Sequence, residues 1–403
     1  MTETNKSNSI VFTVCNLKYL DKALVLGKSL YETNSIILKI YIFDRKIDLP
    51  PLPDYVSITW IEEIADYNFY VNAFKYDVIE LTTSYKPFIA IDLAKRYPES
   101  KILFFDPDIM IFQNLEEISD RLNKYDFILT PHISEIQYDP NENIHLQRFG
   151  FFNLGFFAFA PTENSLNILN WWWKQCSEMA FNEVHSGMFT DQKWMSLLTF
   201  YFNNILILRA KNLNVAWWNL KERKIEILNS SFFIENEPLI FYHFSAFGSN
   251  SKITKREFEL GENSVRTLNR LADVYAISLS KFSLFKKTVK NYSFDYFNDG
   301  SYINPVLRRA FASSIYSFKK DKNPFEKGKE IKNFMKRNYL ESRDHTNFSF
   351  ISHADKSKYS IYYNLFTKSL RLVIRIFGPN RFMAINRMMT YSSSLINYKD
   401  LWK

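Results

Sequence analysis

The 403-residue sequence has few cysteines, no long apolar run and no nucleic-acid-binding motif. Its two cysteines, Cys15 and Cys176, lack the spacing of a metal site and fit a reducing compartment, which excludes a disulfide-stabilised scaffold. No apolar stretch is long enough to cross a bilayer, and the run after the polar N-terminus is too short for a signal-peptide core. We therefore expect a cytoplasmic protein with no membrane-spanning segment and no nucleic-acid partner.

Charge is unevenly distributed along a chain that is long enough for two domains. Residues 251–403 hold 29 lysines and arginines against 13 aspartates and glutamates, a net charge of +16. Residues 1–250 hold 22 against 30, which gives −8 and leaves the whole chain at +8. The two parts therefore face different partners, and the basic part suits an anionic membrane surface or a glycolipid phosphate.

Two aspartates lie between two apolar runs in the middle of the acidic part. Residues 102–105 have the length of a buried strand, and Asp106-Pro107-Asp108 follows them directly. Residues two apart in extended chain point the same way, so both carboxylates can converge on one cation. Such hard oxygen ligands suit Mg²⁺ or Mn²⁺. A surface turn between two strands is the alternative.

The elements around this motif alternate between strand and helix. Residues 9–15, 38–43 and 56–61 are predicted as strands, and residues 21–32 have the apolar spacing of a helix. This order predicts an α/β fold with a parallel sheet. Ligands of such sheets bind beyond the carboxyl ends of the strands, which is where the two aspartates lie.

The segment Phe104-Phe105-Asp106-Pro107-Asp108 resembles the Asp-x-Asp motif of GT-A glycosyltransferases, especially the family 8-like bacterial enzymes. The resemblance covers about residues 9–250 and rests on several motifs in a fixed order. It implies a GT-A, Rossmann-like catalytic domain over residues 1–250, with a mostly parallel central sheet. Residues 251–403 are then a basic, mainly helical C-terminal extension for acceptor or membrane association.

The resemblance also implies residues that bind a nucleotide-sugar donor. In the family the loop after the first strand holds the base and ribose, which here implies Thr13, Cys15 and Tyr19; simple packing is the alternative for each. Residues 81–96 are predicted as one helix with a proline in its first turn. Lys86 then lies near a helix N-terminus, where anions are favoured. By resemblance it contacts the donor, and a solvated lysine is the alternative.

Two later elements are implied as contacts of the donor sugar. Residues 149–159 are apolar except for Asn153, which needs a hydrogen-bond partner, and Gly155 permits a close approach of backbone or ligand. The family's Asn-x-Gly element resembles this stretch, and its Asn binds the sugar. The pair Asp191 and Gln192 follows as in the family, where it lies beside the reacting carbon. A helix cap is the alternative for Asp191.

The resemblance also implies roles for two asparagines, for a third metal ligand and for phosphate contacts. Asn214 and Asn219 belong to a segment resembling one in polysaccharide-locus glycosyltransferases, which places them near donor or acceptor. His243 occupies the place of the family's third metal ligand and would favour Mn²⁺ over Mg²⁺; a hydrogen-bonded core histidine is the alternative. Ser245 and Gly248 could leave their backbone amides for phosphate, whereas Lys252 comes late for the family's phosphate-binding lysine.

The function predicted on this basis is metal-dependent transfer of a sugar from a nucleotide-diphosphate sugar to a glycan or lipid-linked acceptor, in bacterial surface polysaccharide synthesis. The Asp191–Gln192 pattern resembles retaining enzymes. A metal-dependent nucleotidyltransferase or phosphotransferase, and a non-catalytic sugar-binding or membrane-binding module on the same scaffold, stay open as alternatives.

The basic extension contains a helical stripe that could lie on a membrane. Apolar residues recur at spacings of four, three and four, beside a basic face. The stripe is Phe366, Leu370, Val373 and Phe377, and the basic residues are Lys368, Arg371 and Arg375. A core-facing helix is one interpretation, and peripheral attachment to the cytoplasmic face of an anionic membrane is the other. Residues 134–148 are expected to be an irregular acceptor-side loop.

Overall fold

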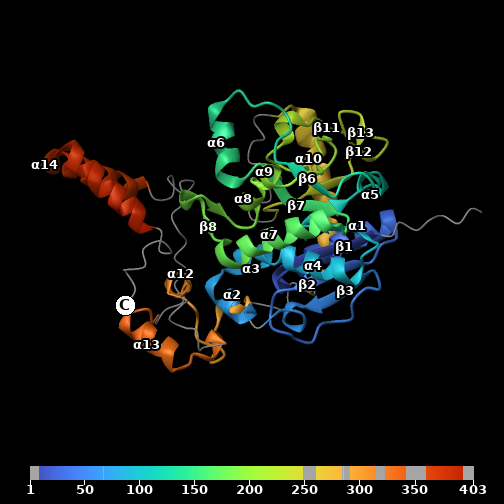
Figure 1. The fold of residues 1–403 in the computed structure, drawn as a ribbon. Coiled ribbons are helices and arrows are strands. Elements are labelled where there is room, and N and C mark those ends of the chain that lie inside the picture. The colour runs from blue at the N-terminus through green and yellow to red at the C-terminus, as the bar shows by residue number, and fades with distance from the viewer. Residues whose placement is uncertain are drawn as a thin grey trace, which may run out of the picture. The chain divides into compact units, whose positions relative to one another are not determined.

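A seven-stranded sheet forms the centre of the fold, with strands in the order β10-β6-β7-β4-β1-β2-β3 (Figure 1). Strand β7 runs antiparallel to β4 and β6, and the other neighbouring pairs are parallel. The strands are β1 (Ser9–Cys15), β2 (Leu38–Ile42), β3 (Val56–Trp60), β4 (Lys101–Phe105), β6 (Phe127–Pro131), β7 (Phe152–Phe159) and β10 (Ile205–Ile207). The predicted α/β class with a mostly parallel central sheet is confirmed.

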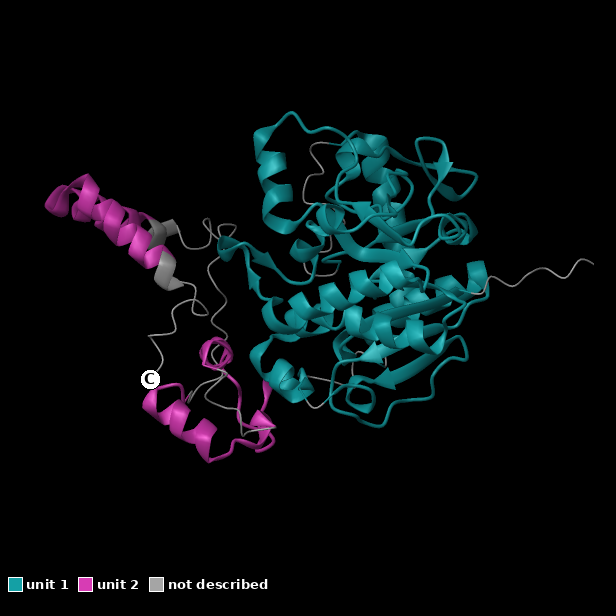
Figure 2. Ribbon diagram, viewed as in Figure 1, with its two compact units in different colours: residues 1–294 teal, residues 295–403 magenta. Residues whose placement is uncertain are grey.

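The computed structural model describes residues 9–66, 68–247, 260–283, 285, 291–314, 323–341 and 360–393. The chain divides into two compact units, Met1–Phe294 and Asp295–Lys403 (Figure 2). The sheet belongs to the first unit. The boundary that we predict after residue 250, between a catalytic domain and an extension, stays a prediction.

Both faces of the central strands are buried, which explains their near-continuous apolar sequence. Phe104 of β4 stacks on Phe157 of β7 and packs against Phe12 of β1, with ring centroids 5.0 Å away in each case. Trp172 covers this face, and its ring centroid is 5.2 Å from that of Phe157. The alternate residue Phe105 points to the opposite face, where it is fully buried. Each fully buried phenylalanine contributes about 1.5–3 kcal/mol to stability.

Helices cover the two faces of the sheet in the first unit. Helices α4 and α7 pack against each other, and α1 packs against β5 and α10. The helices are α1 (Leu20–Asn34), α2 (Phe69–Lys75), α3 (Val78–Ser84), α4 (Lys86–Arg96), α5 (Glu116–Arg121), α6 (Pro140–Phe149), α7 (Glu163–Met179), α8 (Gln192–Met195), α9 (Leu198–Tyr201) and α10 (Glu262–Ser280). In α10, Leu268, Leu271 and Tyr275 join the same apolar core as α1.

Two predicted elements differ from the structure. The single helix predicted over residues 81–96 is two helices, α3 and α4, which meet at Tyr85. The predicted proline in the first turn is confirmed, since Pro87 is the second residue of α4. The irregular loop predicted over residues 134–148 is wrong, because α6 occupies most of it. Asp139 caps this helix by accepting a hydrogen bond from Asn141 N, and Pro140 takes its first turn.

The carboxyl edge of the sheet brings several chain segments together. Strand β4 ends there, and antiparallel β7 begins there with Phe152. Directly after β4, β5 (Ile109–Ile111) pairs antiparallel with β14 (Phe241–His243), which sets His243 opposite Ile109. This pairing carries the end of β14 to the Asp106–Asp108 turn. Smaller antiparallel pieces complete the unit: β8 (Asn182–Glu183) with β9 (Met188–Phe189), and β11 (Ile225–Leu228), β12 (Ser231–Ile234) and β13 (Glu237–Pro238).

The described part of the second unit is mainly helical, as predicted for the C-terminal region. It contains α12 (Pro305–Ser313), α13 (Lys329–Arg337) and α14 (Ser360–Ser393). Within α14 the backbone kinks at Gly378, which has a φ of 78° and precedes Pro379. None of the helices in the described ranges combines the length and the hydropathy needed to cross a membrane.

Candidate active site

Asp106, Asp108 and His243 converge at the carboxyl edge of the sheet. One ligand atom from each residue lies within 4.8 Å of the others. His243 Nε2 is 3.1 Å from Asp108 Oδ1 and 3.9 Å from Asp106 Oδ2. Two carboxylates and an imidazole nitrogen form a donor set that can hold a divalent cation. The side chains suit this role, since Asp108 and His243 are buried and Asp106 is 25% exposed toward solvent.

Backbone hydrogen bonds fix the segments that carry these three side chains. Asp106 N donates to Gly155 O at 2.8 Å, which ties the turn to β7. Phe244 N donates to Asp108 O at 2.8 Å, and His243 N donates to Val215 O at 2.8 Å. The turn residue, its histidine partner and the neighbouring strand are therefore held in register before any ligand binds.

The His243 ring packs directly against Gly155. A Cβ atom added to Gly155 would lie 2.5 Å from His243 Cε1 and 2.6 Å from His243 Nδ1. The edge of Trp218 lies on the ring as well, with centroids 5.3 Å apart. His243 Nδ1 makes no hydrogen bond to the described residues, so packing rather than a polar partner orients the imidazole. A glycine at position 155 is required for this orientation.

A buried lysine neutralises the acidic side of the site. Lys86 Nζ lies 3.1 Å from Asp106 Oδ1 and 3.4 Å from Asp191 Oδ2, and it donates to Leu154 O at 2.9 Å. Burial alone would lower the pKa of Lys86, but the two carboxylates outweigh it and raise that pKa. Burial raises the pKa of Asp191, although Lys86 opposes the rise. Lys86 therefore stays charged while 3% exposed.

Electrostatics around Asp108 favour its ionised form. Burial by itself would raise the pKa of this carboxyl, but His243 and then Lys22 lower it below its usual value. Lys22 Nζ is 4.0 Å from Asp108 Oδ2. An ionised Asp108 is the form that binds a cation.

Asn153 and Gln192 lie next to the triad and are held by hydrogen bonds. Asn153 Oδ1 accepts from Gly155 N and from Asn214 Nδ2, both at 3.0 Å. Gln192 Oε1 accepts from Leu154 N at 3.2 Å. Gln192 Nε2 donates to a backbone carbonyl oxygen at 2.7 Å. Both amides therefore have a fixed orientation beside the triad.

The alternative of a helix cap for Asp191 receives no support. Asp191 precedes α8, but its side chain makes no capping hydrogen bond. Instead it accepts from Thr190 Oγ1 at 3.1 Å and faces Lys86. Its carboxylate is buried, with 3% of the side chain exposed.

The structure places Thr13, Cys15 and Tyr19 differently with respect to solvent. Thr13 and Cys15 are buried, and burial raises the pKa of the Cys15 thiol. Tyr19 is 41% exposed and ends the short 3-10 turn Leu17–Tyr19 that precedes α1. Of these three side chains, only that of Tyr19 is open to a ligand here. Gly248 and Lys252 lie outside the described residues.

Asn214 and Asn219 occupy a tightly bonded turn beside the site. Asn214 has a φ of 50° and donates to Thr130 Oγ1 at 2.8 Å. Asn219 Oδ1 accepts from Ala216 N at 2.9 Å, and its amide donates to Asn214 O at 3.0 Å. Asn219 thus shapes the turn that delivers Asn214 to Asn153.

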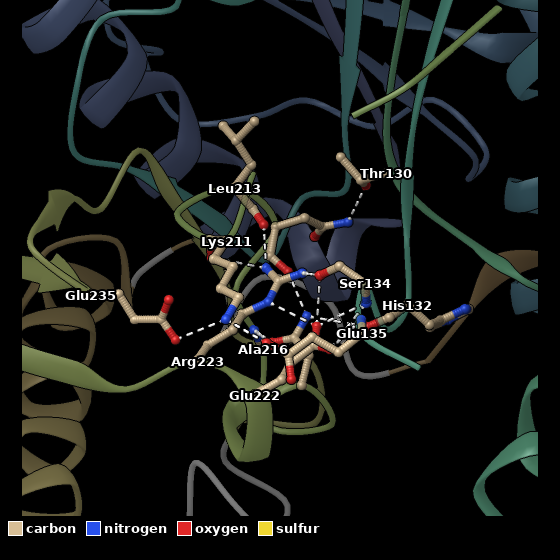
Figure 3. Close-up of polar contacts among 12 residues, drawn as sticks. Thr130, His132, Ser134, Glu135, Lys211, Leu213, Ala216, Glu222, Arg223 and Glu235 are labelled. Carbon is tan, nitrogen blue, oxygen red and sulfur yellow. Dashed lines mark hydrogen bonds and ion pairs between the residues drawn. The ribbon is translucent and has the colours of Figure 1, made fainter. Parts of the chain in front are cut away.

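A buried ion pair fastens this turn to the loop after β6, and the sequence reading missed it. Glu222 accepts hydrogen bonds from Ser134 N, Ser134 Oγ and Glu135 N at 2.8–3.1 Å (Figure 3). Arg223, 2% exposed, lies 3.4 Å from Glu222 and donates to the carbonyl oxygens of Lys211 and Leu213. No local motif marks this pair; the only sequence signal is two adjacent opposite charges.

No family model matches the chain. Two curated Bacillus subtilis (strain 168) relatives are the uncharacterized proteins YfnF, 28% identical over 153 residues, and YfnD, 26% identical over 179 residues. The matches cover 38% and 43% of this chain. The chain spans about half the length of these relatives, 48% and 55% respectively.

The solved structures that the chain resembles include several glycosyltransferases. Galactosyltransferase LgtC, in complex with donor and acceptor sugar analogs, is 13% identical, with 68% of this chain and 95% of LgtC covered and a TM-score of 0.39. Glycosyltransferase GlyE of Streptococcus pneumoniae TIGR4 is 17% identical, with 73% and 67% covered and a TM-score of 0.39. At such low identities and scores these likenesses carry no argument about activity.

Lys22 and His132 are further site neighbours that the sequence reading did not single out. Lys22 lies in the first turn of α1, three residues after Tyr19, so its nearness to Asp108 depends on the meeting of β1 and β4. His132 Nε2 faces Asn153 Nδ2 at 3.3 Å, and its Nδ1 lies 3.0 Å from Gly150 O. Burial lowers the pKa of His132 to about 4.

Proposed function

We propose that this chain is a metal-dependent glycosyltransferase of the GT-A fold, similar to the family 8 enzymes. It moves a sugar from a nucleotide-diphosphate sugar to a glycan or lipid-linked acceptor. The observation that carries the proposal is the convergence of Asp106, Asp108 and His243 at the carboxyl edge of the sheet. Ligands of α/β sheets bind at this edge.

The donor atoms favour Mn²⁺, with Mg²⁺ as the second choice, because one ligand is nitrogen. When bound, the cation would supply positive charge against the departing diphosphate. The chain's own residues position the sugar. Asn153 and Gln192 have orientations fixed by hydrogen bonds, which suits groups that hold a sugar in one pose. Lys86 contacts both Asp106 and Asp191 and offsets one of their two negative charges.

The proposal includes retention of the anomeric configuration. Asp191 is not itself a metal ligand in the proposal, and Lys86 links it to Asp106. Either the Asp191 carboxylate attacks the sugar carbon as the nucleoside diphosphate leaves, or Gln192 supports attack by the acceptor hydroxyl from the same face. NMR of the product anomer tests this, and inversion would contradict it.

The wider setting is also part of the proposal. A cytoplasmic enzyme of bacterial surface polysaccharide synthesis would meet a lipid-linked acceptor at an anionic membrane. Support comes from the excess of basic residues after residue 250 and from α14, in which Phe366 and Phe377 are 54% and 47% exposed. These apolar side chains accompany a basic face, a composition that suits interfacial helices.

A donor screen by thermal unfolding tests the proposed function. Nucleotide-diphosphate sugars are added singly with Mn²⁺, and one or a few should raise the unfolding midpoint. A ligand at 100 times its dissociation constant stabilises by about 2.7 kcal/mol. The Asp108→Asn variant should lose this response, because a neutral amide is a weaker metal ligand. An equal response from Asp108→Asn, or from wild type in chelator, would contradict the proposal.

Product analysis with the donor that binds separates the alternative functions. Transfer of the sugar, with release of nucleoside diphosphate, is the expected result. Nucleotidyl or phosphoryl products would indicate the metal-dependent nucleotidyltransferase or phosphotransferase. Binding without turnover across a range of acceptors would indicate the non-catalytic module.

A further inference from the structure

Lys22 lies between an exposed aromatic ring and the candidate metal site. Its ammonium group is 4.0 Å from the centroid of the Tyr19 ring and 4.0 Å from Asp108 Oδ2. The side chain is 12% exposed. The Lys22 ammonium therefore contacts both an aromatic face and a candidate metal ligand.

These three neighbouring groups suit the three parts of a nucleoside diphosphate bound with a cation. The base or ribose can lie on an exposed aromatic ring, and the diphosphate binds a divalent cation together with the protein. A positive side chain between the two positions meets the phosphate oxygens. Lysine is well suited to this, since its ammonium is a compact charge with three donors.

The other lysine of the site is already engaged. Lys86 is 3% exposed, with two carboxylates and the Leu154 carbonyl oxygen within 3.4 Å of its ammonium. The Lys22 pair with Asp108 is at the outer limit of an ion pair and open to solvent on one side. The Lys22 ammonium can therefore pair with an incoming phosphate, whereas the Lys86 ammonium already has three oxygen partners.

The formal charges of the site also favour an anionic ligand. Asp106, Asp108 and Asp191 carry three negative charges, and Lys86 offsets one of them. A divalent ion with Lys22 then gives a small positive excess, which favours binding of a polyanion.

We propose that Lys22 contacts the diphosphate of a nucleoside-diphosphate ligand that spans from Tyr19 to the Asp106–Asp108–His243 site. The inference rests on the proposed function and deepens it, because it names the residue that recognises the phosphates. Of the phosphate contacts considered from the sequence, Gly248 and Lys252 lie outside the described residues, whereas Lys22 lies within them.

The experiment compares wild type with Lys22→Gln, Lys22→Arg and the control Lys18→Gln, which changes an exposed lysine of the same loop. Calorimetric titrations are run with Mn²⁺ alone, and then with nucleoside diphosphates and the matching nucleosides at saturating Mn²⁺. Lys22→Gln should weaken diphosphate binding about 10- to 100-fold, the effect of losing one charged hydrogen bond. Binding of Mn²⁺ alone and of the nucleoside should not weaken. Lys22→Arg should retain most of the affinity, and Lys18→Gln all of it.

Three results would overturn the inference in distinguishable ways. Equal diphosphate affinity in wild type and Lys22→Gln would show that Lys22 makes no phosphate contact. A matching loss of affinity for Mn²⁺ alone would show that Lys22 only orients Asp108. Failure of wild type to bind any nucleoside diphosphate with Mn²⁺ would overturn the proposed function, and this inference with it. Thermal unfolding without ligand verifies that each variant is folded.

Discussion

Replacement of Gly155 by alanine is the sharpest structural test of the metal site. The new Cβ would lie 2.5 Å from His243 Cε1 and 2.7 Å from Asn153 Oδ1. Non-bonded carbon atoms do not approach so closely, so the imidazole must move. Gly155 has no positive φ, and the substitution therefore acts through space rather than through backbone strain.

The size of the effect follows from this overlap. Overpacking of a close-packed interior costs about 1–3 kcal/mol. Gly155 is an outer-shell neighbour of the ligand His243, and mutation of such neighbours typically lowers metal affinity about 10- to 100-fold. We expect Gly155→Ala to lower the thermal midpoint by several degrees and to weaken Mn²⁺ binding within that range.

Gly27→Ala is the matched control for overpacking. Its Cβ would lie 2.5 Å from Val56 Cγ1, an equally close contact, but in α1 away from His243. Alanine gains about 1 kcal/mol over glycine in a helix, which partly offsets the crowding. Calorimetric Mn²⁺ titration of both variants decides the matter. If Gly155→Ala binds Mn²⁺ as tightly as wild type does, His243 is not a ligand and the reasoning fails.

Three further predictions concern the ion pair, pH and the last helix. Glu222→Ala should cost about 3–5 kcal/mol, because Arg223 is left buried without its carboxylate partner. Glu226→Ala removes the partner of the exposed Lys224 and should cost much less; urea unfolding measures both. The unfolded state protonates His132 near pH 6.5 but the folded state only near 4, so stability should fall as pH drops through that window. His132→Gln should flatten this pH dependence of the urea midpoint, and an unchanged slope would contradict the shift. Full-length protein should float with anionic liposomes at low salt, and a chain truncated before α14 should not; equal behaviour would remove the membrane proposal.

Local sequence patterns predicted most of the sheet and the two aspartates of the site. Apolar runs mark strands whose two faces are both covered, and spacing alone brings Asp106 and Asp108 to one side of a turn. His243 entered only by resemblance. Its place beside Asp108 depends on antiparallel pairing of β5 with β14, which no local signal specifies.

The remaining parts of the site depend on contacts between distant segments. Lys86 meets Asp191 across 105 positions of sequence, and Gly155 meets His243 across 88. Helix α6 escaped prediction for a different reason. None of its residues is buried, so it needs no apolar stripe, which is the pattern that predicts most helices. The sequence does contain its two start signals, the cap Asp139 and the first-turn Pro140.

The most direct test of the account is the metal dependence of sugar transfer itself. Release of nucleoside diphosphate from the nucleotide-diphosphate sugar that binds is followed for wild type with Mn²⁺, for wild type in chelator and for Asp108→Asn. The account predicts turnover in the first case and near-complete loss in the other two, with the Asp108→Asn fold intact by thermal unfolding. Full turnover in chelator, or a fully active Asp108→Asn, would contradict the central claim that Asp106, Asp108 and His243 hold a catalytic cation.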